Sequence, residues 1–427
     1  MSGSKPSALL ARSDVRRFLS GQLVSEVGSR ITREGLPIVA IVAVGSGAPQ
    51  LALLAALSTL PSLLTGNALG RLVDNARRRP LLVGASFTRA ALLAIVPLLY
   101  ILHRLDFAAI AAVTALAATA GVLMAVARHA YLPFLVTRPR IEDGNQLMGA
   151  ADAIGETAGP GIMGLLIQWV GAPFSIIFDA AANITAALSL LTIRVRENHP
   201  RAALSESSDE VTPPPEKIRE VWERVARHPI LRPLWLNAGV SAVFGGFFST
   251  LYELYVLKTL HLSPLWLGVL ITTGGMGSLL GTWLFGNARR RWSLSAVLAS
   301  GYIVFAILNF AVPLAHGGLW VALAFLFVAQ FGGDLFATTS HIAASTIEQQ
   351  VTPDHWLGRV RGTFHAFSGG LEVLGALAAG PLALWLSVRG TLLIAAVGFL
   401  CAAPVLASSR LRAYHPEDDG LSQALWP

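Results

Sequence analysis

Long apolar stretches constrain this chain more than any other feature of its sequence. Twelve of them reach about the 20 residues that a helix needs to cross the hydrocarbon core of a bilayer. They are rich in Ala, Leu, Val and Gly and run without polar alternation, which predicts helices and not barrel strands. The expected spans are 18–45, 49–73, 81–102, 107–131, 146–170, 173–193, 233–257, 264–286, 294–314, 318–345, 363–387 and 389–408.

The composition excludes the main alternatives to a membrane protein. Only 13% of the residues are charged and 54% are hydrophobic, whereas a soluble domain carries roughly 25% charged residues. The single cysteine, Cys401, excludes a disulfide framework and a cysteine-based metal site, and no histidine spacing indicates a metal. The net charge of +7 is attributed to membrane topology, so no nucleic-acid partner is expected.

The distribution of basic residues predicts the orientation of the chain. If both termini lie in the cytoplasm, the outer loops hold only Arg104, Lys258 and Arg389, and most of the 32 lysines and arginines fall inside. This bias follows the positive-inside rule and predicts a multi-pass protein of the plasma (inner) membrane. The arginines that lie within spans or near their ends are Arg30, Arg33, Arg89 and Arg128.

An internal repeat divides the chain into two halves. The pentapeptide Asn-Ala-Arg-Arg-Arg occurs at 75–79 and again at 287–291, about half the chain length later. The tripeptide Ala-Gly-Pro recurs in the same way at 158–160 and 379–381. We therefore expect two pseudo-symmetric six-helix halves with the substrate site between them. The expected segments are an N-terminal arm 1–17, a first half 18–193, a cytoplasmic linker 194–232, a second half 233–409 and a tail 410–427.

The linker contains one structured element by its pattern. A run of prolines at 213–215 precedes a stretch in which Ile218, Val221, Trp222 and Val225 share one helical face. This pattern predicts an amphipathic helix that lies in the membrane interface.

Three motifs resemble those of the major facilitator superfamily. The segment 70–79 is similar to the signature of the loop between the second and third spans, although Arg71 and Ala76 depart from it. The stretch 127–133 resembles the enterobactin-exporter and multidrug-efflux branch of drug:proton antiporters. A partial match to the antiporter signature of the fifth span consists of Gly155, Gly159, Pro160 and Gly164. The resemblance covers essentially the whole chain and implies an all-helical secondary transporter that works by alternating access.

The first arginine loop is expected to form a cytoplasmic gate. The resemblance implies a latch, with Gly70 allowing close helix packing and Asp74 capping a helix or pairing with Arg128. The alternative is that the arginines only set the topology. The second loop has Gly286 where the first has Asp74, so replacing Asp74 should impair transport more than replacing Arg289. The gate candidates are Gly70, Asp74, Arg77, Arg78, Arg79 and Arg128.

Charged residues within spans are functional candidates because burying a charge in a bilayer is costly. In the first span Glu26, Arg30 and Glu34 fall on one helical face, which indicates either a wet cavity for an anion or a structural ladder. In the fifth span Asp152 and Glu156 lie one turn apart, which suits proton uptake and release. The proton-coupling candidates are Glu26, Glu34, Asp152, Glu156, Asp334 and Glu372, and the cavity candidates are Arg30, Arg33, Asp179, Glu253, Phe248, Tyr252 and Tyr255.

These features predict proton-coupled export of an amphipathic organic molecule, either a siderophore or drugs. The alternatives are an importer or facilitator of an anionic metabolite or lipid, and a non-transporting membrane receptor. No nucleotide-binding loop and no nucleophile–base constellation is present, so we expect no enzyme activity and no cofactor besides the proton gradient. The expected partners are the lipid bilayer, a small-molecule substrate and protons, with a monomeric chain.

Overall fold

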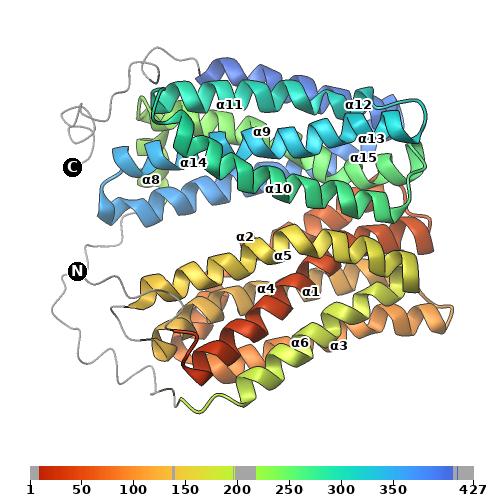
Figure 1. Ribbon diagram of the computed structural model, residues 1–427, viewed down its shortest axis with the longest axis vertical. Coiled ribbons are helices and arrows are strands. Elements are labelled where there is room, and N and C mark those ends of the chain that lie inside the picture. Colours follow the sequence, from red (N-terminus) through yellow and green to blue (C-terminus); the bar gives the residue numbers. More distant parts are fainter. Residues whose placement is uncertain (1–8, 137–139, 196, 198–217, 407–410, 412–427) are drawn as a thin grey trace. The chain divides into compact units, whose positions relative to one another are not determined.

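The computed structural model describes residues 9–136, 140–195, 197, 218–406 and 411. Most of the N-terminal arm, the linker residues 198–217 with their proline run, and most of the tail lie outside the described residues. Within the described ranges every regular element is a helix, as Figure 1 shows.

Six helices precede the linker. They are α1 (Ser13–Ala43), α2 (Ala48–Asn75), α3 (Arg78–Ile101), α4 (Phe107–Leu135), α5 (Ile141–Val170) and α6 (Ala172–Leu191). Local signals set their ends: the Asp106 carboxylate accepts the Ala109 amide at 2.8 Å and caps α4. Gly171, with a φ of 87°, separates α5 from α6 because few other residues adopt that angle. α1 packs against α5 and α6, and α3 packs against α4 and α6.

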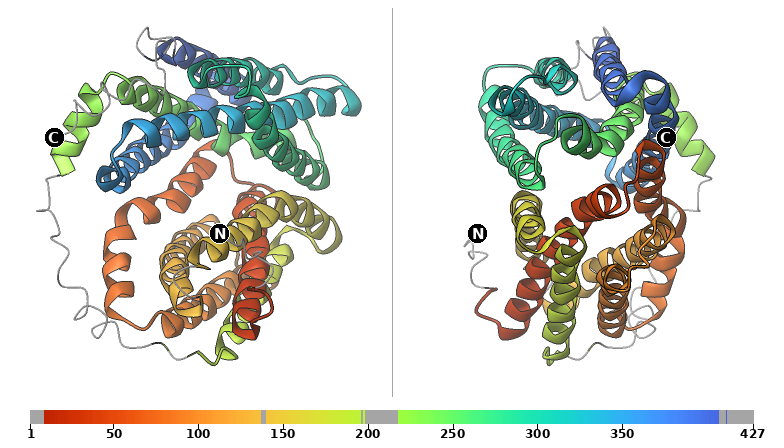
Figure 2. Two further views of the ribbon diagram at one scale, coloured as in Figure 1. Left: turned by 60° about the vertical axis from the view of Figure 1, so that its left-hand side comes forward. Right: turned by 90° about the vertical axis from the view of Figure 1, so that its right-hand side faces the viewer.

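The second part of the chain has more interruptions. Its elements are α8 (Ile218–Arg227), α9 (Leu231–Leu254), the π-helix η3 (Tyr255–Thr259), α10 (Pro264–Ala288), α11 (Leu294–Asn309), α12 (Ala311–Leu314), α13 (Leu319–Phe327), the π-helix η4 (Val328–Gly332), α14 (Gly333–Val351) and α15 (Asp354–Leu406). α15 contains a break at Ser387, where φ is 71°. α9 and α15 pack along each other, as the further views in Figure 2 show.

All twelve predicted apolar stretches fall on these helices, with ends shifted by a few residues. The correspondence is not one to one, because α15 covers the last two stretches, and the seventh, ninth and tenth stretches are each divided among two or more elements. Among the described residues, nine helices are long and apolar enough to cross a membrane. α1 and α5 are not among these nine helices. These two helices carry most of the charged residues that were predicted to act in coupling. The chain is therefore an all-helical, multi-pass protein, and the count of twelve crossings stays a prediction.

Contacts divide the chain into two compact units. The first unit comprises 1–47, 57–212 and 264–272, and the second comprises 48–56, 213–263 and 273–427. The first turns of α2 and of α10, which are equivalent helices in the internal repeat, each belong to the other unit.

The linker helix α8 packs on protein. Val221 and Val225 are buried in the core of the second unit. The Trp222 ring meets Trp235 of α9 edge-on at 5.4 Å and Phe367 of α15 at 5.8 Å. The helix was predicted correctly, but the expectation that its apolar face lies in the membrane interface was wrong, because α9 and α15 cover that face.

Candidate functional site

An arginine of α4 connects three helices of the first unit. The Arg128 guanidinium forms an ion pair with Glu26 of α1 and a second one with Asp152 of α5 at 3.3 Å. All three side chains are at most about one third exposed, so the charges are partly removed from water. A guanidinium suits this bridging role because its donors are held in a fixed planar fork.

A second ion pair joins α1 and α5, one turn further along both helices. Arg30 Nη1 of α1 is 3.2 Å from Glu156 Oε1 of α5. The Glu156 side chain is 63% exposed, whereas that of Arg30 is only 20% exposed. Since an ionised carboxylate facing lipid would be costly, we expect Glu156 to face a water-filled path.

Glycines of α5 allow this close approach of α1. A side-chain Cβ added at Gly155 would lie 3.0 Å from Glu26 Cβ, and one at Gly159 would come closer than 3 Å to Arg30 Cβ. Two other members of the predicted antiporter motif face α10: a Cβ added at Gly164 would lie 3.2 Å from Gly268 Cα. Gly268 belongs to 264–272, a segment of the same unit. The motif glycines therefore fix the contacts of both faces of α5.

The structure corrects two predicted pairings. Glu26 and Arg30 do not form a ladder along α1, because their partners come from α4 and α5. Arg33 pairs with its neighbour Glu34 at 3.7 Å and is 66% exposed. Arg128 is engaged by Glu26 and Asp152 and not by Asp74, because its side chain is directed toward α1 and α5.

Two predicted cavity residues are fully buried. Asp179 of α6 is 0% exposed and pairs with Arg89 of α3 at 3.0 Å. Tyr255 is also 0% exposed; its hydroxyl donates to the Ala315 carbonyl at 3.0 Å and accepts from Arg389 Nε at 3.2 Å. Neither side chain reaches a solvent-accessible surface in this structure, and their roles in a substrate cavity stay predictions.

The remaining candidates of the second unit are dispersed. Phe248 stacks on Phe399 of α15 with ring centroids 5.5 Å apart, so its ring packs on protein. Asp334 follows the π-helix η4 and accepts the Gln330 amide at 3.2 Å. Glu253 is buried, whereas Tyr252 and Glu372 are half-buried. Nothing in these positions tests their predicted roles in coupling or substrate binding.

The first arginine loop contacts the end of α6. The backbone amides of Arg78 and Arg79 donate to the Glu197 carboxylate at 2.7 and 3.1 Å. The Arg79 side chain also donates to the Leu190 carbonyl at 2.9 Å. In the second loop, by contrast, the hydrogen bond of the Arg289 side chain within the described part of the chain stays in its own turn and goes to the Trp292 carbonyl. The two copies of the repeat therefore differ in structure, and the role of Asp74 in a latch stays a prediction.

Other predicted gate features are not as expected. Among the described residues nothing lies within 4 Å of the Cβ that Gly70 lacks, so this glycine does not serve close packing here. Asp74 lies in the last turn of α2 and does not cap α3, whose N-cap is Arg77. Two glycines of α10 in the second half, Gly277 and Gly281, pack tightly against the backbone at Phe331 and Leu335.

Sequence reasoning missed the roles of Arg89 and Glu197. An arginine in the middle of an apolar span is itself a signal, because it requires a buried partner. The partner could not be named from the sequence, since Asp179 lies 90 residues away. Glu197 gave no signal, because it lies in a polar segment where carboxylates are common.

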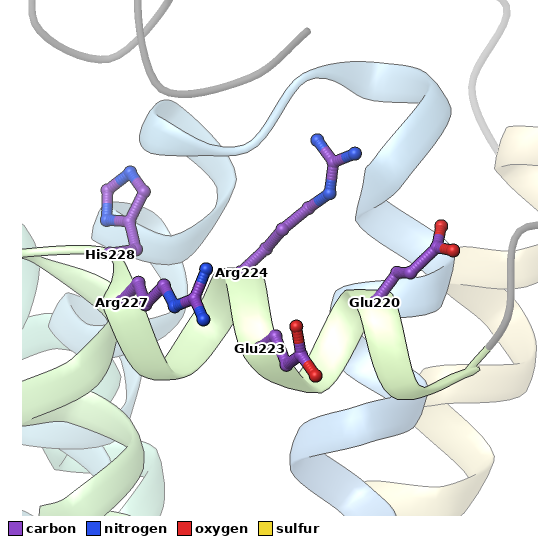
Figure 3. A pocket seen from close by; sticks show the side chains of 5 residues that line it. All are labelled: Glu220, Glu223, Arg224, Arg227 and His228. Carbon is purple, nitrogen blue, oxygen red and sulfur yellow. The ribbon is translucent and has the colours of Figure 1, made fainter.

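A pocket of about 430 Å³ lies on the polar side of α8, in the second unit. Figure 3 shows its lining side chains, Glu220, Glu223, Arg224, Arg227 and His228, projecting from α8 and the turn after it. His228 Nδ1 accepts the Ile230 and Leu231 amides at 3.2 and 3.1 Å and so holds the start of α9. Burial lowers the pKa of His228 from 6.5 to about 4.

Comparison with known proteins identifies the class. The family model of the Major Facilitator Superfamily matches residues 19–371, and the chain belongs to this superfamily of membrane transporters. It is 26% identical to the multidrug efflux pump Tap of Mycolicibacterium fortuitum over 86% of this chain and 88% of that protein.

Two solved structures share the fold. A bacterial homologue of the iron transporter ferroportin, in an inward-facing state, matches with a TM-score of 0.69 and 15% identity, over 94% of this chain and 99% of that one. The nucleoside transporter NupG matches with a TM-score of 0.71 and 13% identity, over 95% of this chain and 100% of that one. At these identities the likeness concerns the fold alone.

Proposed function

We propose that this transporter exports amphipathic organic molecules, drugs or siderophores, in exchange for protons and by alternating access. The observation that carries the proposal is the Arg128 bridge between Glu26 and Asp152. The bridge ties three helices together by charges that protonation can remove. Similarity to a multidrug efflux pump supports export of drugs in particular.

The chemistry of the bridge favours coupling to protons. Protonation of Asp152 neutralises the carboxylate and weakens its hold on Arg128, while Glu26 still compensates the guanidinium. The contact between α4 and α5 then loosens without leaving an unpaired buried charge. The ion pair of Glu156 supports the same order of events. Its carboxylate is exposed to water, and its partner Arg30 lies on α1.

The proposal includes the predicted topology. Twelve crossings with both termini in the cytoplasm place the two arginine loops on the cytoplasmic side, in keeping with the bias of basic residues. We assign the protein to the plasma (inner) membrane as a monomer.

One observation favours a second candidate, an importer or facilitator of an anionic metabolite or lipid. The Arg33 side chain is 66% exposed, and its ion pair with Glu34 is long at 3.7 Å. Arg30 is a weaker ligand for an anion, because Glu156 already neutralises it. Export remains the better-supported function because the chain is similar to a multidrug efflux pump.

The test is transport by purified protein in liposomes under an imposed pH gradient, with ethidium as the amphipathic probe. Asp152→Asn and Glu156→Gln should each reduce the pH-driven initial rate by about a hundredfold, the lower end for loss of a proton-transfer group. Glu142→Gln is the matched control: the same chemistry in the exposed first turn of α5 should leave the rate unchanged.

The outcomes separate the candidates. Transport that continues unchanged after the gradient is collapsed would refute proton coupling. If ethidium and a catechol siderophore both fail while an organic anion is taken up without a gradient, and Arg33→Gln abolishes that uptake, the second candidate replaces the first.

A further inference from the structure

A second charged cluster of the first unit is separate from the Arg128 bridge and is largely buried: the Arg89 side chain is 11% exposed and that of Asp179 is 0% exposed. Arg89 of α3 and Asp179 of α6 form an ion pair of 3.0 Å. The same Arg89 nitrogen donates to Ser29 Oγ of α1 at 2.9 Å. The second oxygen of Asp179 accepts the Asn183 amide at 2.7 Å. Both carboxylate oxygens are thus bonded inside the protein.

Glycines on two helices make room for this pair. A Cβ added at Gly28 of α1 would lie 2.7 Å from Asp179 Oδ1, and one at Gly121 of α4 would lie 3.2 Å from Arg89 Nη1. Four helices, α1, α3, α4 and α6, therefore meet at a single ion pair. Such packing leaves little freedom for α1 to rotate or slide, because interiors this dense do not deform continuously.

The contacts of α1 divide between two sides. Gly28 and Ser29 face the buried pair of α3 and α6. Glu26, two residues before Gly28, and Arg30, directly after Ser29, face α4 and α5. Because a helix turns by about 100° per residue, holding Gly28 and Ser29 on one side fixes the direction of Glu26 and Arg30 on the other.

From this geometry we propose that Arg89 and Asp179 are positioning residues that set the rotation and depth of α1 and thereby aim Glu26 and Arg30 at their partners. The consequence for transport rests on the proposed coupling through Glu26 and Arg30; the positioning itself does not. Asp179 is not a proton carrier in this arrangement, because it is 0% exposed and both its oxygens are engaged.

The first experiment is a rescue test in liposomes. Asp179→Asn leaves the Arg89 guanidinium buried without its counter-charge, which is the costly case, whereas neutralising both partners is mild. We expect the single variant to lose transport about tenfold with a shifted pH profile. The double variant Arg89→Gln/Asp179→Asn should return to within about threefold of the wild-type rate, with the wild-type pH profile.

The second experiment reads the position of α1 without transport. A Cβ at Gly21 of α1 would lie 3.2 Å from Ser189 Cβ of α6, close to the separation of a disulfide. In a Cys401→Ser background, Gly21→Cys/Ser189→Cys should cross-link readily. The cross-linking yield should fall at least about threefold with Asp179→Asn and recover in the double variant.

The two readouts distinguish the possible failures. A double variant that melts like wild type but does not transport would overturn the positioning role, because the charges themselves would then be needed. A cross-linking yield that Asp179→Asn leaves unchanged would overturn it as well. If cross-linking and rescue behave as expected but transport ignores the pH gradient, positioning stands and the proposed function falls.

Discussion

Replacing Gly159 with Ala tests how α5 holds the charged face of α1. The new Cβ would come closer than 3 Å to Arg30 Cβ, and that atom adjoins the backbone and cannot swing away. Restoring ordinary contact requires α1 and α5 to separate by roughly 1 Å, which densely packed helices resist. Glu156 lies one turn earlier on the same face of α5, so the Arg30–Glu156 distance of 3.2 Å would exceed the limit of an ion pair.

The control lies on the same helix. Nothing described lies within 4 Å of the Cβ that Gly149 lacks, so Gly149→Ala gains helix propensity without a clash. Both variants gain about the same propensity, roughly 0.5–1 kcal/mol. The difference between the two variants in free energy of unfolding therefore measures the clash at Gly159. Overpacking of this kind costs about 1–3 kcal/mol.

Thermal melting in detergent and pH-driven ethidium transport in liposomes are the assays. Gly159→Ala should melt roughly 2–10 °C below Gly149→Ala. It should also lose most of its transport, while Gly149→Ala transports like wild type. If the two variants melt at the same temperature and transport equally, the close contact of α1 with α5 does not control the Arg30–Glu156 pair.

Three further predictions concern the loops and the linker helix. Arg78→Ala should slow liposome transport more than Arg289→Ala, because the Arg78 side chain pairs with the distant Glu197 whereas that of Arg289 bonds to Trp292 in its own turn. Equal losses of transport would contradict the structural asymmetry of the two loops. Trp222→Ala should lower the free energy of unfolding by about 2–3 kcal/mol, whereas Trp385→Ala, at an 89% exposed site, should change it by less than about 0.5 kcal/mol. A melting experiment in which both variants match wild type would remove the docking role of α8. Burial lowers the pKa of His228 from 6.5 to about 4, so its contribution to stability is complete above pH 6.5 and is lost as the pH falls toward 4. His228→Asn keeps an acceptor for the first amides of α9. Its melting temperature should therefore fall less between pH 7 and pH 5 than that of wild type. An identical fall in melting temperature would show that another group controls stability in acid.

The sequence alone located the helices and the charged residues within them. The predicted stretch 81–102 became α3, and 264–286 became α10, because a bilayer fixes the length of a span and its hydropathy. The arginine loops and the acids of α1 and α5 were visible for a related reason: charges are rare in such helices, so each one is conspicuous.

Only the tertiary structure decided which charges pair. Helical periodicity put Glu26, Arg30 and Glu34 on one face, but it gave no information on the helices opposite that face. Arg30 binds an acid 126 residues away and Arg89 binds one 90 residues away. These partners depend on the rotation and depth at which whole helices pack, and glycine contacts such as that of Gly159 with Arg30 set both. Periodicity within one helix contains no record of that packing, which explains why the sequence predicted a membrane transporter with charged spans but not its ion pairs.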